Sequence, residues 1–271
     1  MQRSTVQSSL LVLSVALPLV ACSKQHDECT AQPGIEVDAY YDPVIDPADF
    51  TTIIDNPYLP WVPGTVFTYD GTSDGEPQHN VVTVTDQTRV IMGVTCVAVD
   101  DRVEVDGELQ EQTTDWYAQD NDGNVWYFGE DSTEYEDGNA STEGSWLAGV
   151  DGGLPGIVMK ADPQVGDRYR QEYLPGEAED AAEVSAVGES VSVQYDSFDN
   201  AVRTREWTPL EACVSEDKWF APGVGFVKST TTAGEQEDME LVSVTDVSAG
   251  AAGSGGAAGA GGAGGAAGAG A

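Results

Sequence analysis

The sequence predicts an all-β, mainly antiparallel fold in which one domain forms a meander that curls into a curved sheet, half-barrel or barrel with minor helix. Two patterns support this fold class. Short runs rich in Val, Thr, Tyr, Phe and Trp, which favour strands, are separated by Gly, Asp and Asn, which favour turns. Helical periodicity is weak except at residues 178–187, where Ala and Glu favour a turn or two of helix. Consecutive strands at this spacing imply antiparallel pairing.

The predicted strands follow one another along the middle of the chain. They cover residues 66–70, 80–85, 89–99, 101–105, 109–119, 124–129, 167–173, 189–195, 201–208, 217–221, 225–232 and 239–247. At Asp106-Gly107 a two-residue loop would place Val105 opposite Glu108. A three-residue loop with a bulge would place Val105 opposite Leu109, and we favour it because it pairs two apolar side chains.

The N-terminus has the features of a secretory signal peptide. Arg3 precedes an apolar run over residues 10–21 that is too short to span a membrane. The sequence Leu19-Val20-Ala21-Cys22 resembles the lipobox of bacterial lipoproteins, in which the cysteine is diacylated and becomes the new N-terminus. This resemblance implies a lipid-anchored envelope protein, and Ser23 after the cysteine favours the outer membrane.

Four segments are therefore expected. Residues 1–21 are the signal peptide, 22–51 a polar tether containing proline with one short helical turn near residues 46–50, 52–248 the β-rich domain, and 249–271 a Gly/Ala tail. The tail has no large apolar side chain to offset its ordering entropy, so we expect it to be disordered.

The chain is strongly acidic. Its formal net charge is −36, which becomes −37 when the signal peptide with its single Arg3 is removed. Such a charge repels DNA, RNA and anionic headgroups, so nucleic-acid partners are not expected. It suits a soluble exported domain, and it would also attract cations.

Three cysteines remain once Cys22 is lipidated. Cys96 lies in an apolar run and Cys213 follows a turn, so these two are candidates for one disulfide in an oxidising compartment, which leaves Cys29 over. The spacing does not establish any pairing. No closely spaced cysteine pairs of the kind that bind zinc occur.

Residues 115–131, DWYAQDNDGNVWYFGED, are the stretch with the most chemistry. Asp120, Asp122 and Asn124 match the first positions of a calcium loop, but Val125 stands where that loop needs glycine. A hairpin with a type I′ turn at Asp122-Gly123 fits better. It would pair residue 117 with 128, 118 with 127 and 119 with 126, so calcium remains a weak alternative.

The aromatic residues of this hairpin are candidate ligand-lining residues. In the predicted register Tyr117, Trp126 and Phe128 share one face and Trp116 and Tyr127 the other. A hairpin that is apolar on both faces is either central to a layered structure or lines a concavity. Trp146, Trp207 and Trp219 are further candidates.

No catalytic motif is found, so we do not expect an enzyme. The alternative is a polysaccharide hydrolase that would use paired carboxylates near aromatic rings, with Asp115, Glu130 and Asp131 as the candidates. The sequence contains no nucleophile elbow, phosphate loop, dinucleotide fingerprint or HExxH motif.

Several longer segments resemble a family of bacterial secreted proteins and lipoproteins that has no known activity. They are NPYLPWVPGTVFTYDG, DWYAQDNDGNVWYFGE, GSWLAGVDGGLPGIVM, VGDRYRQEYLPGEAED and DKWFAPGVGFV. The resemblance implies no catalytic residues. The WFAPGVG segment is also similar to envelope carriers in which a curved sheet wraps a helix, although this chain lacks the long amphipathic helix of such carriers.

Together these features predict an exported lipoprotein with a non-catalytic role, in binding or in the structure of the envelope. Its expected partners are the membrane, through the lipid anchor, and an apolar or amphiphilic ligand held in an aromatic-lined concavity or an envelope protein. No cofactor is expected. A calcium-dependent surface interaction is the second alternative to the binding role.

Overall fold

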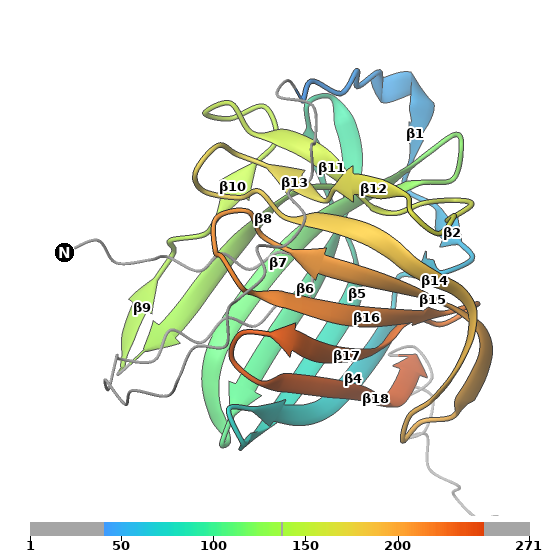
Figure 1. The fold of residues 1–271 in the computed structure, drawn as a ribbon. Helices are drawn as coiled ribbons and strands as arrows, with labels where there is room; N and C mark the ends of the chain where they lie inside the picture. Colours follow the sequence, from blue (N-terminus) through green and yellow to red (C-terminus); the bar gives the residue numbers. More distant parts are fainter. Residues whose placement is uncertain (1–40, 137, 247–271) are drawn as a thin grey trace, which may run out of the picture.

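The computed structural model describes residues 41–136 and 138–246, and these form a β-barrel built from one long antiparallel sheet, with β2 and β3 paired in a separate two-stranded sheet. Figure 1 shows strands β14 to β18 crossing in front of β4 to β8. The strands are β1 (Phe50–Thr51), β2 (Ile54–Asn56), β3 (Leu59–Trp61), β4 (Thr65–Ser73), β5 (Glu76–Ile91), β6 (Val94–Val105), β7 (Glu108–Asp120), β8 (Val125–Glu136), β9 (Asn139–Ser141), β10 (Trp146–Leu147), β11 (Leu154–Met159), β12 (Arg168–Arg170), β13 (Glu172–Tyr173), β14 (Ala181–Ser192), β15 (Ser197–Trp207), β16 (Ser215–Ala221), β17 (Gly225–Ala233) and β18 (Glu237–Asp246). The predicted fold class is confirmed.

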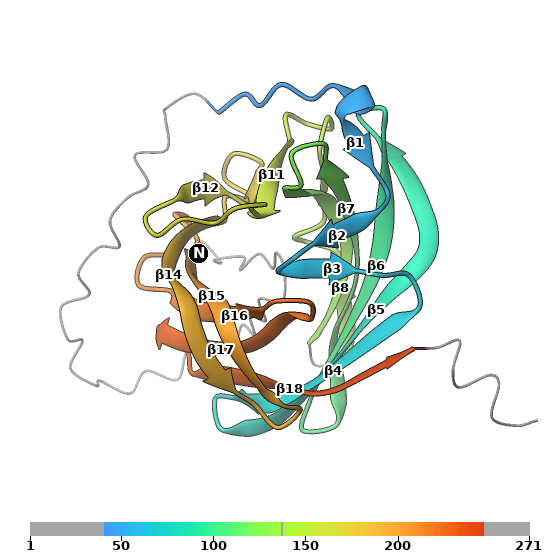
Figure 2. The ribbon, with the colours of Figure 1, turned by 90° about the vertical axis from the view of Figure 1, so that its right-hand side faces the viewer.

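The two ends of the sheet meet, which makes the barrel nearly closed. The strand order is β12-β14-β15-β16-β17-β18-β4-β5-β6-β7-β8-β11-β13, and its first and last strands are separated in the chain by Gln171 alone. Gly156 of β11 lies against the Gln171 backbone so closely that any Cβ at position 156 would clash with it. Figure 2 shows the resulting arrangement, with β14 to β17 on one wall and β4 to β8 on the other.

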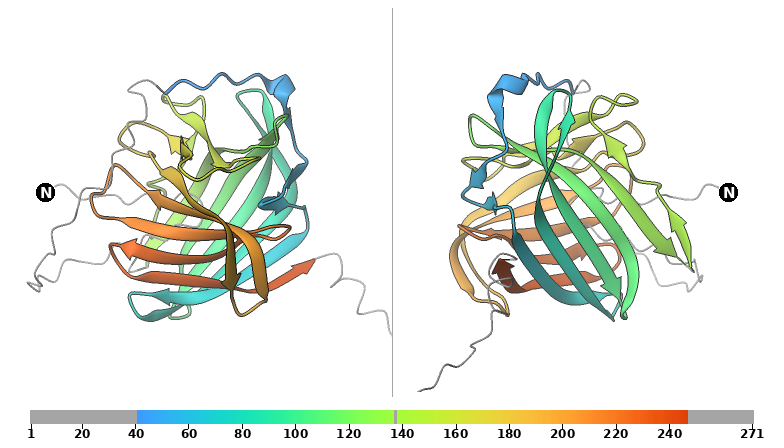
Figure 3. Two further views of the ribbon diagram at one scale, coloured as in Figure 1. Left: turned by 45° about the vertical axis from the view of Figure 1, so that its right-hand side comes forward. Right: turned by 180° about the vertical axis from the view of Figure 1, so that it is seen from behind.

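The first and last strands of the main meander are joined to each other. The C-terminal strand β18 pairs with β4 over its whole length, from Glu237 opposite Ser73 to Asp246 opposite Thr65. Both views in Figure 3 show β18 beside β4 at the same edge of the barrel. This pairing brings together residues about 170 positions apart, and it makes the two halves of the chain one continuous sheet.

The turn at Asp106-Gly107 has two residues, and the expected pairing of Val105 with Leu109 is wrong. Both turn residues have positive φ, 50° and 80°, as a type I′ turn requires, and Val105 lies opposite Glu108. The additional residue of the bulge lies in the strands next to the turn, where the register shifts between Val103 and Glu104. The bulge is thus in the strand and not in the loop.

A second turn divides the predicted strand over residues 89–99. Met92 and Gly93 have φ of 50° and 85°, β5 ends at Ile91, and β6 begins at Val94. The sequence hides this turn because methionine seldom adopts positive φ and apolar residues flank it on both sides. The predicted runs 94–99 and 101–105 are one strand, β6.

The helical turn expected in residues 178–187 is wrong, because this segment belongs to β14 from Ala181 onward. Ala181, Ala182 and Val184 are fully buried between β12 and β15. Packing in the sheet outweighs the helix preference of alanine here. The turn expected near residues 46–50 is confirmed as a 3-10 helix, Pro47–Asp49, whose start is capped by the Asp46 carboxylate accepting from Ala48 N at 3.0 Å.

The segments at the two ends lie mostly outside the described residues. These include the predicted signal peptide, Cys22, Cys29 and the Gly/Ala tail. Residues 50–51, which were assigned to the tether, form β1 and pair with β7. Within residues 41–136 and 138–246, no helix is long and apolar enough to cross a membrane.

Candidate functional site

The hairpin over residues 115–131 is present, but its register differs by one residue from the prediction. Tyr117 lies opposite Tyr127, Ala118 opposite Trp126 and Gln119 opposite Val125. The loop is longer than a type I′ turn, since Asp120 N donates to Asn124 O and only Gly123 has positive φ, 89°. The Asp120 carboxylate accepts from Asn124 N at 2.8 Å and fixes this longer loop.

The proposed calcium ligands have structural partners in this loop. The second oxygen of Asp120 accepts from the Asn124 amide and from Trp126 Nε1, both at 2.8 Å. The side-chain oxygen of Asn124 accepts from Ala161 N at 3.0 Å, and Asp122 is exposed. A calcium ion bound here would have to displace these hydrogen bonds, and the calcium site stays a prediction.

The new register changes which aromatic residues share a face. Tyr117 and Tyr127 lie on the inner face with their rings stacked at 5.0 Å, so the predicted grouping of Tyr117 with Trp126 and Phe128 is wrong. Trp126 and Phe128 lie on the opposite face against Phe50, with ring centroids 6.0 and 5.5 Å from it.

The inner-face rings form a column across the barrel wall. Trp61 contacts Tyr117 at 4.5 Å and Trp146 contacts Tyr127 at 5.5 Å, which extends the stacked tyrosine pair at both ends. These four residues are buried. Such edge and stacked contacts stabilise a packed core, so this column is a rigid wall next to the polar side chains described below.

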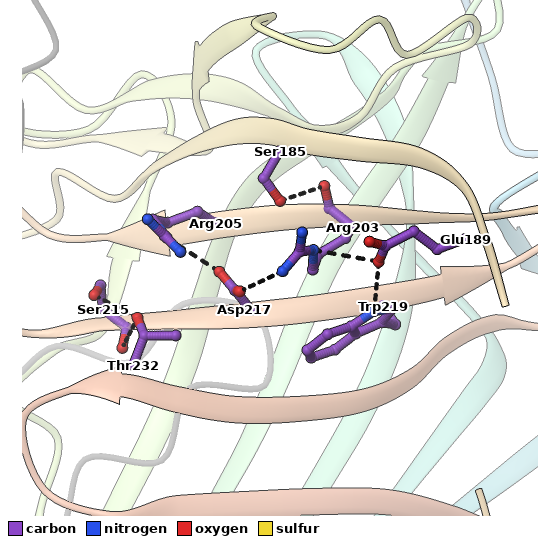
Figure 4. A network of polar contacts seen from close by, with 8 residues as sticks. All are labelled: Ser185, Glu189, Arg203, Arg205, Ser215, Asp217, Trp219 and Thr232. Carbon is purple, nitrogen blue, oxygen red and sulfur yellow. Dashed lines mark hydrogen bonds and ion pairs between the residues drawn. The ribbon is translucent and has the colours of Figure 1, made fainter. Parts of the chain in front are cut away.

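The remaining aromatic candidates lie elsewhere. Trp116 is on the outer face, where the Arg89 guanidinium lies 4.3 Å from its ring centroid. Trp207 is buried on the same face as Arg205 and Arg203, which are two and four residues away on β15. Trp219 is on that outer face too, as the polar network in Figure 4 shows, where its Nε1 donates to Glu189 at 2.9 Å.

Carboxyl groups continue the inner face of β7 and β8 beyond the aromatic column. Glu111, Thr113, Asp115 and Tyr117 alternate along β7 and are all buried, and Glu130 lies directly opposite Asp115. On β6, Asp101 lies opposite Thr113 and is also buried. Directly opposed residues have Cβ atoms about 5 Å apart, so these side chains are neighbours.

We call the buried acids Asp101, Asp115 and Glu130, together with the buried Asn80 beside Asp101, the inner acid group. Tyr127 connects it to the aromatic column, because its hydroxyl donates to Asp115 Oδ1 at 2.7 Å. Gly129, with φ of 128°, forms a bulge in β8 between the two, and a Cβ at this position would clash with the Trp146 backbone. The bulge adds one residue to β8 between Tyr127 and Glu130. For this reason Glu130, and not Gly129, lies opposite Asp115.

Burial is the main cause that shifts the ionisation of these acids. It raises the pKa of Asp115 to about 7, against the lowering effect of the Tyr127 hydrogen bond. It raises the pKa of Asp101 and of Glu130 well above the usual range, and the charge of Asp115 raises both further. Near neutral pH this group therefore holds protons that exposed carboxyls would have lost.

A second set of buried charges, the Lys218 cluster, lies on the inner face of β15 and β16. Lys218 is 1% exposed, and its ammonium lies 2.9 Å from Glu206 Oε2 and 3.1 Å from Glu216 Oε1. Burial favours the neutral amine, but the two carboxylates outweigh it and raise the pKa of Lys218 above its usual range. Opposed pairs run from Lys218 through Ser229, Met239 and Gly71 to Gln78, two residues from Asn80 on β5.

Of the three carboxyls proposed for a hydrolase, the structure brings together Asp115 and Glu130. Asp131 is exposed on the other face of β8. The sequence analysis did not identify Asp101, Glu111, Glu206, Glu216 or Lys218. The alternation of Glu111, Thr113 and Asp115 with exposed or half-buried neighbours was the available signal for β7.

The disulfide suggested between Cys96 and Cys213 is not formed. Cys96 is a free thiol buried on β6, and its Sγ lies 3.7 Å from Val94 O, whereas Cys213 is disulfide-bonded. Burial raises the pKa of the Cys96 thiol to about 12, which makes it unreactive. Cys96 therefore belongs to the apolar core of the barrel, whereas Cys213 lies between β15 and β16.

Comparisons with known proteins find relatives only at the level of solved structures. No family model and no curated protein sequence matches the chain. A protein from Bacteroides fragilis described as exported, with a YmcC-like fold, matches with a TM-score of 0.44 and 17% identity over 70% of this chain and 99% of its own. A protein from Parabacteroides distasonis described as a lipoprotein matches with a TM-score of 0.40 and 14% identity over 69% and 98%.

Proposed function

We propose that this protein is an exported lipoprotein, anchored through Cys22 in the outer membrane, whose barrel binds an amphiphilic ligand without catalysis. The observation that carries the proposal is the inner face of β5 to β8. There the column of Trp61, Tyr117, Tyr127 and Trp146 adjoins the inner acid group. An amphiphile needs such a pair of neighbouring surfaces, one apolar and one polar.

The polar part of this face retains unused hydrogen-bonding capacity. Within the described part of the chain, both polar atoms of the Asn80 side chain lack a hydrogen-bond partner, as do Asp101 Oδ1 and Glu130 Oε1. Buried polar atoms are nearly always paired in folded proteins, because desolvation without a partner costs about 1–3 kcal/mol. A ligand with donors would satisfy the three oxygens among these atoms.

Asp115 and Glu130 are also the carboxyls that the alternative function, a polysaccharide hydrolase, would use. A glycosidase that works with two carboxyls needs one ionised and one protonated at the working pH. Here burial raises the pKa of Asp115 to about 7 and that of Glu130 well above its usual range, so the two carboxyls ionise at different pH. We therefore keep the polysaccharide hydrolase as the alternative, to be tested by release of reducing ends from envelope polysaccharides.

Native mass spectrometry of the protein purified from its own envelope tests the binding role. We expect a ligand mass that persists under native conditions and disappears after denaturation. Glu130→Gln should reduce its occupancy, whereas Asp131→Asn, one residue away but exposed, should leave it unchanged. A native mass equal to that of the acylated chain alone would contradict the binding role.

The lipid anchor is tested separately. Wild-type protein should incorporate a labelled fatty acid and fractionate with the outer membrane, because two or three acyl chains contribute about 0.8 kcal/mol for each buried methylene. Cys22→Ser should abolish the label. Labelling that persists in Cys22→Ser, or wild-type protein that fractionates as freely soluble, would contradict the anchor.

A further inference from the structure

We infer that the inner acid group takes the primary ammonium group of an amphiphilic amine. The inference rests on the proposed function, since it names the polar head of the ligand whose apolar part would lie along the aromatic column. It requires that the inner acid group lack a cation of its own, that it retain unpaired acceptor atoms, and that an ammonium suit the site better than a metal ion.

The first requirement is met by the charges that surround the group. Among the described residues, the charged groups that act on Asp101, Asp115 and Glu130 are all acids. They are Asp100, Glu111 and Glu172, together with Asp115 itself, which acts on Asp101 and Glu130. Each of these charges raises the pKa of its neighbour. Like charges that are buried together gain most from a cation placed among them.

Asn80 supplies an observation that is independent of the acids. Its side chain is 0% exposed, lies on the inner face opposite Val103 and Tyr69, and is directed at Asp101, whose pKa it lowers. The contact between the Asn80 amide and the Asp101 carboxyl does not have the geometry of a hydrogen bond. Within the described residues both amide atoms of Asn80 are therefore without a hydrogen-bond partner. The Asn80 carbonyl is therefore a further acceptor for an incoming N–H group.

The Lys218 cluster is an example, within the same barrel, of how a buried ammonium group is bound by carboxylates. Its Nζ lies between a carboxylate from β15, Glu206, and one from β16, Glu216, at 2.9 and 3.1 Å. Glu206 and Glu216 lie directly opposite each other on neighbouring strands. In the inner acid group, Asp115 of β7 and Glu130 of β8 lie opposite each other in the same way. The difference is that no described lysine reaches between them.

The neighbouring rings suit the carbon next to an ammonium. The Tyr127 hydroxyl binds Asp115, and the Tyr127 ring stacks on Tyr117 and contacts Trp146. Aromatic faces attract cations and pack against methylenes. A divalent metal fits less well, because no three of the described His, Cys, Asp and Glu side chains are arranged to hold one.

Isothermal titration with four dodecyl compounds tests the head group on the full mature chain at pH 8, each compound being kept below its critical micelle concentration or its solubility limit. The probes are dodecylamine, dodecyltrimethylammonium, dodecanol and dodecanoate. We expect one dodecylamine per chain, bound about ten-fold or more tightly than the others, because only the primary ammonium has both the charge and the N–H donors.

Variants connect the binding to the site. Asp115→Asn and Glu130→Gln should each weaken dodecylamine about ten-fold or more, and Asp131→Asn is the matched control because it removes an acid from the exposed face of the same strand. Circular dichroism establishes that each variant is folded, and either inner-face variant alone suffices if the other does not fold.

The outcomes separate the two proposals. Equal affinity for dodecylamine and dodecanol, or equal weakening by Asp131→Asn, would overturn the ammonium head group while the binding role remains. The second result would mean that the net charge of the mature chain, −37, attracts the amine to the surface. No binding of any dodecyl compound would overturn both proposals.

Discussion

The inner acid group and the Lys218 cluster are two solutions to the same problem on opposite walls of one barrel. Each places carboxyls on directly opposed positions of neighbouring strands, and all of them are buried except Glu216, which is partly buried. In the Lys218 cluster the chain supplies the cation, at 2.9 and 3.1 Å from its two partners. In the inner acid group, burial raises the pKa of Asp115 to about 7, so protons take the place of a cation.

This difference indicates on which wall the chain itself compensates the buried carboxyl charges. A buried ammonium with two carboxylates is a closed ion network, and removing one member leaves uncompensated charge. A group of protonated carboxyls can still exchange its protons for a cation. Burial raises the pKa of Glu237 to about 8, and the charges of Glu216 and Glu111 raise it further. Glu216 belongs to the Lys218 cluster, and Glu111 also acts on the acids of the inner acid group. The two walls are thus electrostatically connected.

The largest expected effect comes from removing the internal cation. Lys218→Met leaves Glu206 and Glu216 buried without their ammonium, so we expect a loss of about 3–5 kcal/mol in the free energy of unfolding, measured with urea at pH 7. Lys228→Met is the control, because the Lys228–Glu240 pair is about one-third exposed and should contribute at most about 1 kcal/mol. Equal losses in the two variants would remove the distinction that we draw for Lys218.

A smaller effect is expected from the pH dependence of the other wall. The folded state keeps the Asp115 proton up to about pH 7, whereas the unfolded chain loses it near pH 4. Stability should therefore fall as the pH rises from 4 to 7 and change little for this group above 7.

Asp115→Asn removes this titration. Between pH 5 and pH 8 the fall in the free energy of unfolding should be about 2–3 kcal/mol smaller than in the wild type. The ionisable groups around position 115 are the same in both proteins: Asp100, Asp101, Glu111, Tyr117, Tyr127, Glu130 and Glu172. Asp131→Asn should leave the wild-type slope unchanged, and a slope that is also unchanged in Asp115→Asn would contradict the buried, protonated state.

Local sequence chemistry predicted the strands well and the registers less well. The alternation in β7 and the Asp-Gly turns are local, so the hairpins could be placed. The register of residues 115–131 depends on the Asp120 carboxylate binding Asn124 N, which lengthens the loop by an interaction that turn preferences do not contain. One residue of error then exchanged the faces of Trp126, Tyr127 and Phe128.

The candidate site depended on contacts that are distant in sequence. Barrel closure at Gln171 and the pairing of β18 with β4 join segments that no local pattern connects. With 47 acids in the chain, sequence alone could not select the few that become buried together. Lys218 reads as an ordinary strand residue until the register places Glu206 and Glu216 beside it.

The hydrogen bond between the aromatic column and the acids should have an intermediate effect. Tyr127→Phe removes the donor 2.7 Å from Asp115 Oδ1 and leaves a buried acceptor, so we expect a loss of about 1–2 kcal/mol in urea unfolding. The pKa of Asp115 should rise further, because this bond lowers it. Tyr195→Phe, at an exposed tyrosine, should cost far less, and a Tyr127→Phe variant as stable as the wild type would mean that the bond is not formed.

The smallest effect is expected on the outer face, where the same types of charge meet solvent. Arg205 Nε lies 3.1 Å from Asp217 Oδ1, and Arg203 holds the other oxygen at 3.0 Å, as Figure 4 shows. The Arg205 side chain is 45% exposed, so Arg205→Ala should change the free energy of unfolding by about 0.5 kcal/mol, and less in 1 M salt. A loss above about 2 kcal/mol would mean that ion pairs outside this barrel stabilise it as strongly as those inside, and burial would then no longer explain the contrast between its two inner walls.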